Sequence, residues 1–193
     1  SEGDGVWTRI QGEFWREGGL APNLQLVDVL PRFTDEAVGV IRDHARLESK
    51  KPLFLYLAYP APHTPWLPTP EFQGRTDNMY GNFTVMVDHM IGRVLEALDH
   101  SGLKEETLVI FSSDNGPVWY DKDVERCGHD AVGGLNGMKG DAYEGGHRMP
   151  FIVRWPGKVE PGSASGQAIC FTDVLATLAE VSGAKLPAGQ APD

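Results

Sequence analysis

Leu-Phe-Leu-Tyr-Leu-Ala-Tyr, residues 53–59, and Thr-Leu-Val-Ile-Phe-Ser, residues 107–112, are the two stretches of sequence that decide the fold. Each is a short apolar run bounded by turn formers, which is typical of a strand buried on both faces of a parallel sheet. Between them, from about Met79 to His100, apolar residues recur with the 3.6-residue period of a helix. Strand, helix and strand in this order predict a right-handed βαβ unit with parallel strands.

The flanking sequence extends this pattern in both directions. Thr34 reads as the N-cap of a helix that continues to about Ser49, after an irregular start over residues 1–30. Phe151 to Trp155 predicts another strand, and Thr172 to Ser182 a final helix. The glycine-rich stretch 116–146 predicts no regular element. The fold class expected is therefore α/β, a largely parallel sheet flanked by helices.

Composition narrows the choice of partners. The 193 residues carry a net charge of -10, with no basic stripe that could neutralise phosphates, so we expect no nucleic acid. No run of eighteen apolar residues occurs, so we expect no membrane span. Cys127 and Cys170 show no metal or disulfide spacing, although a single bridge between them stays open. The oligomeric state stays open as well.

Polar residues follow both predicted strands, in Pro62-His63-Thr64-Pro65 and in Ser113-Asp114-Asn115-Gly116-Pro117. Ligands of open parallel sheets bind beyond the carboxyl ends of the strands, so we expect both loops on one edge. Asp114 and Asn115 offer a carboxylate and an amide oxygen, which suit Ca²⁺ or Mg²⁺ better than zinc. Taken alone, the Asp-Asn-Gly-Pro run is more readily a turn whose residues serve the backbone.

Two further side chains are candidates for chemistry. His63, held between two prolines, could give a proton or contact an anion, and its alternative is a surface loop histidine. Lys139 lies among glycines, where the backbone can approach a ligand closely, and could hold an anionic oxygen as a point charge. Its alternative is a solvated loop lysine.

Taken together, these segments resemble the sulfatase family of the alkaline-phosphatase-like superfamily, from about Pro31 to Pro187. The resemblance rests on four motifs in order, LFLYLAYPAPHTPW, TLVIFSSDNGP, GMKGDAYEGGHRMPFIVRWPG and FTDVLATLAEVSGAKLP. It implies that Asp114 and Asn115 match the later pair of metal ligands in the family. It also implies that His63 and Lys139 match the histidine and lysine that contact the sulfate.

What the resemblance implies about activity is sulfate-ester hydrolysis with a formylglycine nucleophile and a divalent cation, calcium or magnesium. The substrate would be a sulfated small molecule or carbohydrate, and the compartment periplasmic or secreted. A phosphatase, phosphodiesterase or phosphonate hydrolase of the same superfamily is the alternative, as is a non-catalytic domain that kept the fold.

Several parts of the family pattern are not matched. Neither Cys127 nor Cys170 lies in the Cys/Ser-x-Pro/Ala-x-Arg motif of the nucleophile, and the early Asp-Asp pair and the Lys-x-His motif have no counterpart. We therefore expect residues 1–193 to be a partial sulfatase catalytic domain, without the nucleophile-bearing N-terminal part and the small C-terminal domain. Such a segment would not turn over substrate alone.

Three other residues are open to more than one interpretation. His129 could contact substrate or be a plain loop residue. Glu144 is better read as structural than as a substrate contact. Asn82 heads an Asn-Phe-Thr glycosylation pattern, but it falls inside the predicted helix, so we expect no glycan there.

Overall fold

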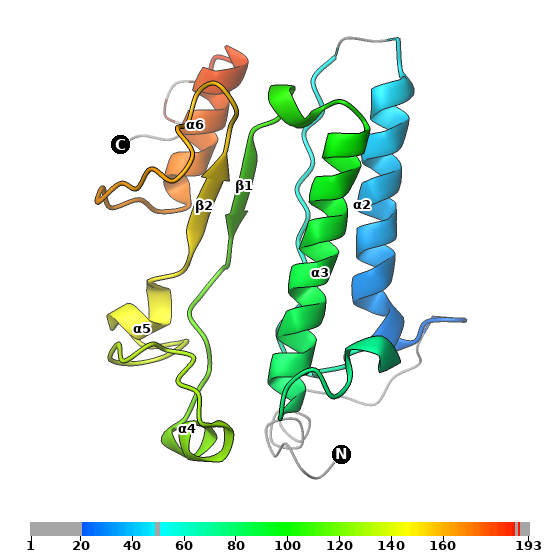
Figure 1. Cartoon of the computed structure of the whole chain (residues 1–193). Coiled ribbons are helices and arrows are strands. Elements are labelled where there is room, and N and C mark those ends of the chain that lie inside the picture. Colours follow the sequence, from blue (N-terminus) through cyan, green and yellow to red (C-terminus); the bar gives the residue numbers. More distant parts are fainter. Residues whose placement is uncertain (1–20, 49–50, 188, 190–193) are drawn as a thin grey trace. The chain divides into compact units, whose positions relative to one another are not determined.

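The computed structural model describes residues 21–48, 51–187 and 189. The chain divides into two compact units, Ser1–Val159 and Glu160–Asp193, which are described separately. The irregular start expected over residues 1–30 lies outside the described residues as far as residue 20. Figure 1 labels the α-helices and the strands. The order of the described elements, short 3-10 helices included, is η1 (Leu26–Asp28), α2 (Val29–Arg46), η2 (Pro70–Phe72), α3 (Met79–His100), η3 (Lys104–Glu106), β1 (Val109–Ser112), α4 (Asp121–Cys127), α5 (Glu144–His147), β2 (Phe151–Arg154) and α6 (Thr172–Ser182).

Helix α2 begins at Val29, five residues before the predicted N-cap, and ends at Arg46 rather than Ser49. The prediction for Thr34 was wrong because Pro31 is tolerated in a first turn, where backbone N–H groups have no intrahelical partner. Thr34 is instead fully buried in the helix. Its hydroxyl donates to the carbonyl oxygen of Leu30 at 2.9 Å and lies 2.8 Å from the Tyr59 hydroxyl.

Helix α3 covers Met79–His100, as predicted from its apolar period. The side chain of Asn78 caps its first turn by accepting a hydrogen bond from the Gly81 amide at 2.7 Å. At the other end Gly102 takes a φ of 72°, a left-handed conformation that glycine adopts without strain. Local capping and periodicity therefore agree on both ends of this helix.

Helices α2 and α3 pack side by side and form the core of the larger unit, as Figure 1 shows. One buried cluster joins Leu30 to the start of α3, and a second joins Val38 and Ile41 to the end of α3. The members of the two clusters are Leu30, Phe72, Phe83, Met86 and Met90, and Val38, Ile41, Ala97 and Leu98. Burial of these apolar side chains is the main force that holds the two helices together.

Asn82 lies inside α3 and is 5% exposed. Its side-chain oxygen accepts hydrogen bonds from the amide and the hydroxyl of Thr76, at 2.7 and 3.2 Å. The expectation that this residue is helical is confirmed. A side chain engaged in this way is unsuited to carry a glycan in the folded protein.

The predicted strand at residues 53–59 is wrong for this structure. The segment belongs to no strand, and most of its side chains are exposed, Phe54 at 73% and Tyr56 at 81%. A strand exists only through hydrogen bonds to a neighbouring strand, and neither of the described strands is hydrogen-bonded to this segment. The apolar run therefore keeps its sequence signature without the sheet that would bury it.

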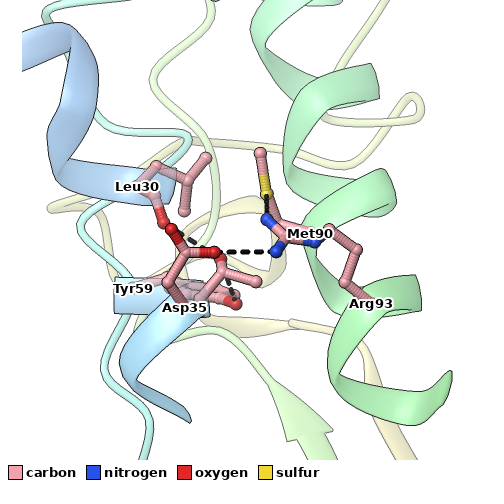
Figure 2. A network of polar contacts seen from close by, with 6 residues as sticks. Leu30, Asp35, Tyr59, Met90 and Arg93 are labelled. Carbon is pink, nitrogen blue, oxygen red and sulfur yellow. Dashed lines mark hydrogen bonds and ion pairs between the residues drawn. The ribbon is translucent and has the colours of Figure 1, made fainter. Parts of the chain in front are cut away.

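The far end of that segment is held firmly. Tyr59 meets α2 at Thr34. Figure 2 shows Tyr59 and, close by, the ion pair of 2.7 Å between Asp35 and Arg93 that joins α2 to α3. Arg93 also donates to the sulfur of Met90 at 3.5 Å. Burial raises the pKa of Tyr59 above 10.0, and this outweighs the lowering by the Thr34 hydroxyl and the Arg93 charge.

Strands β1 and β2 form a two-stranded antiparallel sheet, with Val109 opposite Arg154 and Ser112 opposite Phe151. The predicted strand positions are confirmed within two residues. The parallel pairing predicted for the βαβ unit is not found among the described residues, because its other strand does not form. The chain still combines helices and strands, as the predicted α/β class requires. An ion pair of 3.5 Å between Arg154 and Asp99 ties β2 to the end of α3.

The glycine-rich stretch 116–146 contains two short helices, so the prediction that it lacks regular structure is wrong in two places. Helix α4 forms where the Asp123 carboxylate accepts the backbone N–H of Tyr120 at 3.2 Å and also contacts Arg126 at 3.2 Å. Gly128, with a φ of 61°, ends it. The four-residue α5 carries the Glu-Gly-Gly motif.

The smaller unit contains α6, Thr172–Ser182, at the predicted position. The Asp173 carboxylate accepts the Cys170 amide at 2.8 Å, and Gly183 ends the helix with a φ of 70°. Cys127 and Cys170 are both free thiols in this structure. Within the described residues, every helix is too short or too polar to span a bilayer.

Candidate functional site

The loop after β1 carries the predicted metal ligands. Asp114 is exposed, and its carboxylate makes no hydrogen bond or ion pair with the described residues. Asn115 is half-buried and donates from Nδ2 to the carbonyl oxygen of Gly116 at 2.8 Å. This bond orients the amide and leaves its oxygen without a partner among the described residues. Both side chains therefore present a free oxygen, as a hard cation requires.

Glycines lock this loop against α5. The Gly116 amide donates to the carbonyl oxygen of Gly146 at 2.8 Å. A Cβ at Gly116 would collide with the backbone carbonyl of Gly145, and a Cβ at Gly145 with the carbonyl of Gly137. The loop of Asp114 and Asn115 is thus in direct backbone contact with α5, and α5 with the segment at Gly137, which only glycine permits at these positions.

The same contacts bring Lys139 to the loop of Asp114 and Asn115. The Lys139 amide donates to the carbonyl oxygen of Pro117 at 2.9 Å, and the Gly145 amide donates to that of Asn136 at 2.8 Å. The Lys139 side chain is half-buried and forms no ion pair with the described residues. Three of the four predicted site residues therefore come from loops that are hydrogen-bonded to each other.

The Glu-Gly-Gly motif has the structural role expected of Glu144. Its carboxylate pairs with Arg148 at 3.1 Å, and its carbonyl oxygen accepts the Arg148 amide at 2.8 Å. Both bonds close the single turn of α5. This turn in turn supports the glycine contacts with the loop of Asp114.

His63 lies in an exposed loop between Pro62 and Pro65, each preceded by a cis peptide bond. Its Nδ1 is 2.8 Å from the carbonyl oxygen of Thr64. A carbonyl oxygen only accepts, so Nδ1 carries the proton of this bond. Nε2 is therefore the nitrogen left to take up and release a proton. The Trp66 indole fixes the loop by donating to the carbonyl oxygen of Pro62 at 3.1 Å.

A row of aromatic side chains connects the His63 loop with the segment that follows Pro117. Ring centroids are 5.5 Å apart between Trp66 and Tyr80, and 4.8 Å between Tyr80 and Trp119. Trp119 then meets His129, whose carbonyl oxygen accepts its indole N–H at 2.7 Å. These aromatic contacts were missed from sequence, where Tyr80 is only a helix residue and Trp119 only a loop residue.

Asp114 and Asn115 are ligands of the kind that a hard divalent cation prefers, but they are too few to complete its coordination. Calcium takes about six to eight oxygen ligands. Asp114 and Asn115 supply two, and the described part of the chain contains no group of three or more His, Cys, Asp or Glu side chains able to hold a metal. Asp114 and Asn115 would therefore supply only part of the ligands of such a site.

Comparison with known proteins identifies the family to which the chain is similar. The model of the Sulfatase family matches residues 31–184. An N-acetylgalactosamine-6-O-sulfatase of Bacteroides thetaiotaomicron is 36% identical over 93% of this chain, and the steryl-sulfatase of Mus musculus is 38% identical over 81%. A solved structure concerned with glycosaminoglycan metabolism by Bacteroides thetaiotaomicron matches 88% of this chain and 36% of its own, with a TM-score of 0.79 and 36% identity.

The chain spans 35% and 25% of the lengths of those two curated relatives. Its likeness to the solved structure confirms the expected α/β class, the alkaline-phosphatase-like fold of sulfatases, present in part. With a family model over most of its length and related sulfatases along nearly all of it, this chain belongs to the sulfatase family.

Proposed function

We propose that this chain is part of a sulfuric ester hydrolase and supplies metal ligands and sulfate contacts to its active site. The observation that carries the proposal is the interlocking of the Asp114–Asn115 loop, the Lys139 loop and α5 through backbone bonds. Family membership supports sulfate-ester hydrolysis. This interlocking would let the two oxygen donors, on Asp114 and Asn115, and the Lys139 ammonium act on one sulfate group.

Asp114 and Asn115 are proposed as ligands of a divalent cation, calcium or magnesium. The support is their free oxygen atoms at the end of β1, in a loop whose backbone is fixed by Gly116. A cation bound there would neutralise charge on the sulfate oxygens. Further ligands would come from other parts of the complete protein, because the described residues contain no group of three His, Cys, Asp or Glu side chains.

Lys139 and His63 are proposed to contact the sulfate group. The Lys139 ammonium would hold one sulfate oxygen as a point charge. His63 would hold a proton on Nε2 and give it to the departing ester oxygen, because Nδ1 is engaged with the Thr64 carbonyl. The two side chains thus stabilise different negative charges, one on the sulfate and one on the leaving group.

The nucleophile is proposed to be a formylglycine elsewhere in the complete protein. Cys127, in Arg-Cys-Gly-His-Asp, and Cys170, in Ile-Cys-Phe-Thr-Asp, do not lie in the motif that is converted in this family. The hydrated aldehyde would supply the attacking oxygen. Residues 1–193 on their own are therefore proposed to be a partial catalytic domain without turnover.

The proposed substrate is a sulfated carbohydrate, and the proposed compartment is the periplasm or the cell exterior. The similar Bacteroides thetaiotaomicron protein is named for the 6-O-sulfate of N-acetylgalactosamine. That name supports the substrate class and not a particular sugar. Separate extracts of periplasm, cytoplasm and medium, assayed for turnover of N-acetylgalactosamine 6-sulfate, would test both parts.

The proposal is tested by expressing the complete coding sequence and comparing 4-nitrophenyl sulfate with 4-nitrophenyl phosphate. We expect turnover of the sulfate, its loss in Asp114→Ala, and its retention in Asp43→Ala. Asp43 is a matched control because its side chain is 78% exposed on α2, paired only at the surface with Arg46. Preference for the phosphate would favour a phosphatase instead, and wild-type activity in Asp114→Ala would refute the proposed role of that carboxylate.

A further inference from the structure

The turn that carries Lys139 is closed by an acidic side chain, Asp141. Its Oδ2 accepts the Met138 amide at 2.9 Å, and its own amide donates to the Met138 carbonyl oxygen at 2.9 Å. Residues 138–141 are therefore clamped by two hydrogen bonds, one of them to a charged acceptor. Hydrogen bonds to a charged group are stronger than those between neutral groups.

This clamp acts on the two peptide groups that precede the Cα atom of Lys139. The Met138 amide is held by Asp141, and the next amide, that of Lys139, is held by the carbonyl oxygen of Pro117 at 2.9 Å. The Met138 carbonyl and the Lys139 amide belong to one peptide group, which is held by the Asp141 amide at one end and by Pro117 at the other, and Lys139 lies inside the turn that the Asp141 carboxylate closes. Asp141 thus constrains the backbone at Lys139 through the turn, and the loop of Asp114 and Asn115 constrains it through the Pro117 carbonyl.

Glycine contacts leave the turn little freedom to relax. A Cβ at Gly137 would come within 3.0 Å of the Asp141 side chain, and a Cβ at Gly146 would collide with the carbonyl oxygens of Asp141 and Met138. Gly137 has a φ of 78°, which also favours glycine. The backbone around Asp141 is thus packed against α5 on one side and against its own turn on the other.

We propose that Asp141 is a positioning residue, whose carboxylate aims the Lys139 ammonium at the sulfate group. This inference rests on the proposed function and adds to it a residue that does not itself touch substrate. Asp141 is exposed and forms no ion pair among the described residues, so its carboxylate is engaged with the turn alone. Its negative charge is not needed for binding an anion. The presence of Asp141 is explained by the hydrogen bond with which its carboxylate closes the turn.

A second carboxylate in the same segment provides a matched control. Asp130 accepts the amides of Val132 and Gly134, at 2.9 and 2.6 Å, and so closes a turn of the same kind. That turn does not include Lys139. Asp130→Ala removes at least as many side-chain contacts to the backbone as Asp141→Ala does, without loosening the lysine.

The test is a double-mutant cycle in the complete protein, measured as kcat/KM on 4-nitrophenyl sulfate with melting temperature as a check on folding. We expect Asp141→Ala to lower kcat/KM roughly 10- to 100-fold, the range for losing a hydrogen bond to a charged group that orients a reacting side chain. Asp141→Asn, which keeps the acceptor oxygen, should recover most of the loss. Asp130→Ala should change kcat/KM by less than about twofold.

The decisive comparison uses Lys139→Ala as the background. If Asp141 acts through the lysine, adding Asp141→Ala there costs less than about twofold further. A full multiplicative loss in that background would overturn the inference, as would an unchanged Asp141→Ala. Should the alanine variant fail to fold, Asp141→Leu takes its place, because leucine is close to aspartate in shape and has no acceptor oxygen, and wild-type activity in that variant would overturn the inference too. A wild-type protein without sulfate turnover would instead overturn the proposed function.

Discussion

Replacing Gly116 by alanine should damage the site through a single added methyl group. The Gly116 φ lies outside the left-handed region, so alanine can adopt the backbone conformation. The added Cβ would collide with the Gly145 carbonyl, which belongs to rigid backbone. Overpacking of this kind costs about 1–3 kcal/mol. Weakening the bond from the Gly116 amide to Gly146 adds about 1 kcal/mol.

A smaller effect acts in the opposite direction. Alanine restricts the unfolded chain and so stabilises by roughly 0.4–1 kcal/mol. The net expectation is a loss of about 2 kcal/mol in the free energy of unfolding. Because the loop of Asp114 and Asn115 must also move away from α5, a shift of about 1 Å could lower kcat/KM roughly 100-fold.

Gly92→Ala is the matched control for this prediction. Gly92 lies inside α3, and a Cβ there would meet nothing within 4 Å. The same substitution should therefore stabilise the complete protein by about 0.5–1 kcal/mol. Denaturant unfolding followed by fluorescence, with kcat/KM on 4-nitrophenyl sulfate, measures both effects. The reasoning is refuted if Gly116→Ala is as stable and as active as Gly92→Ala.

Two further predictions concern the helices that support the site. Asn78→Ala should destabilise the protein by about 1 kcal/mol in thermal or denaturant unfolding, because the Gly81 amide loses its cap, whereas Asn78→Ser should keep most of the stability. For Tyr59, burial raises the folded-state pKa above 10.0, so its contribution to stability is complete below about pH 10 and is lost as the pH rises through the folded pKa. Tyr59→Phe should therefore show a shallower fall in stability above about pH 10 than wild type, and identical slopes would contradict the assignment.

The helices that the sequence predicted at their observed bounds have local signals. Helix α3 has an apolar period over its full length, an asparagine cap at Asn78 and a glycine just past its end. Helix α6 likewise ends at Gly183. Capping side chains and left-handed glycines lie within a few residues of the helix that they end, so the sequence contains the information needed.

The errors have a common physical origin in contacts between distant segments. Residues 53–59 have a strand sequence, but a strand also needs a neighbour to accept its hydrogen bonds. Helix α2 starts early because Thr34 is buried against Tyr59 rather than placed at a cap. The short α4 is polar enough to look like a loop, and depends on the Asp123 carboxylate binding the backbone of Tyr120.

The sequence names the candidate site residues but does not give their arrangement. Motif order was enough to single out Asp114, Asn115, Lys139 and His63. The glycine contacts that join the first three residues are backbone approaches between segments about 30 residues apart in sequence. The aromatic row from the His63 loop to Trp119 likewise joins segments that no local pattern relates.

Metal content is the most direct test of the central claim, that the loop after β1 forms part of a sulfatase metal site. The complete protein, its Asp114→Ala variant and its Asp43→Ala variant would be dialysed against calcium-free buffer and analysed by inductively coupled plasma mass spectrometry. We expect about one tightly bound calcium or magnesium ion per molecule in the wild type and in Asp43→Ala, and a large loss in Asp114→Ala. Equal metal content in all three proteins would contradict the claim.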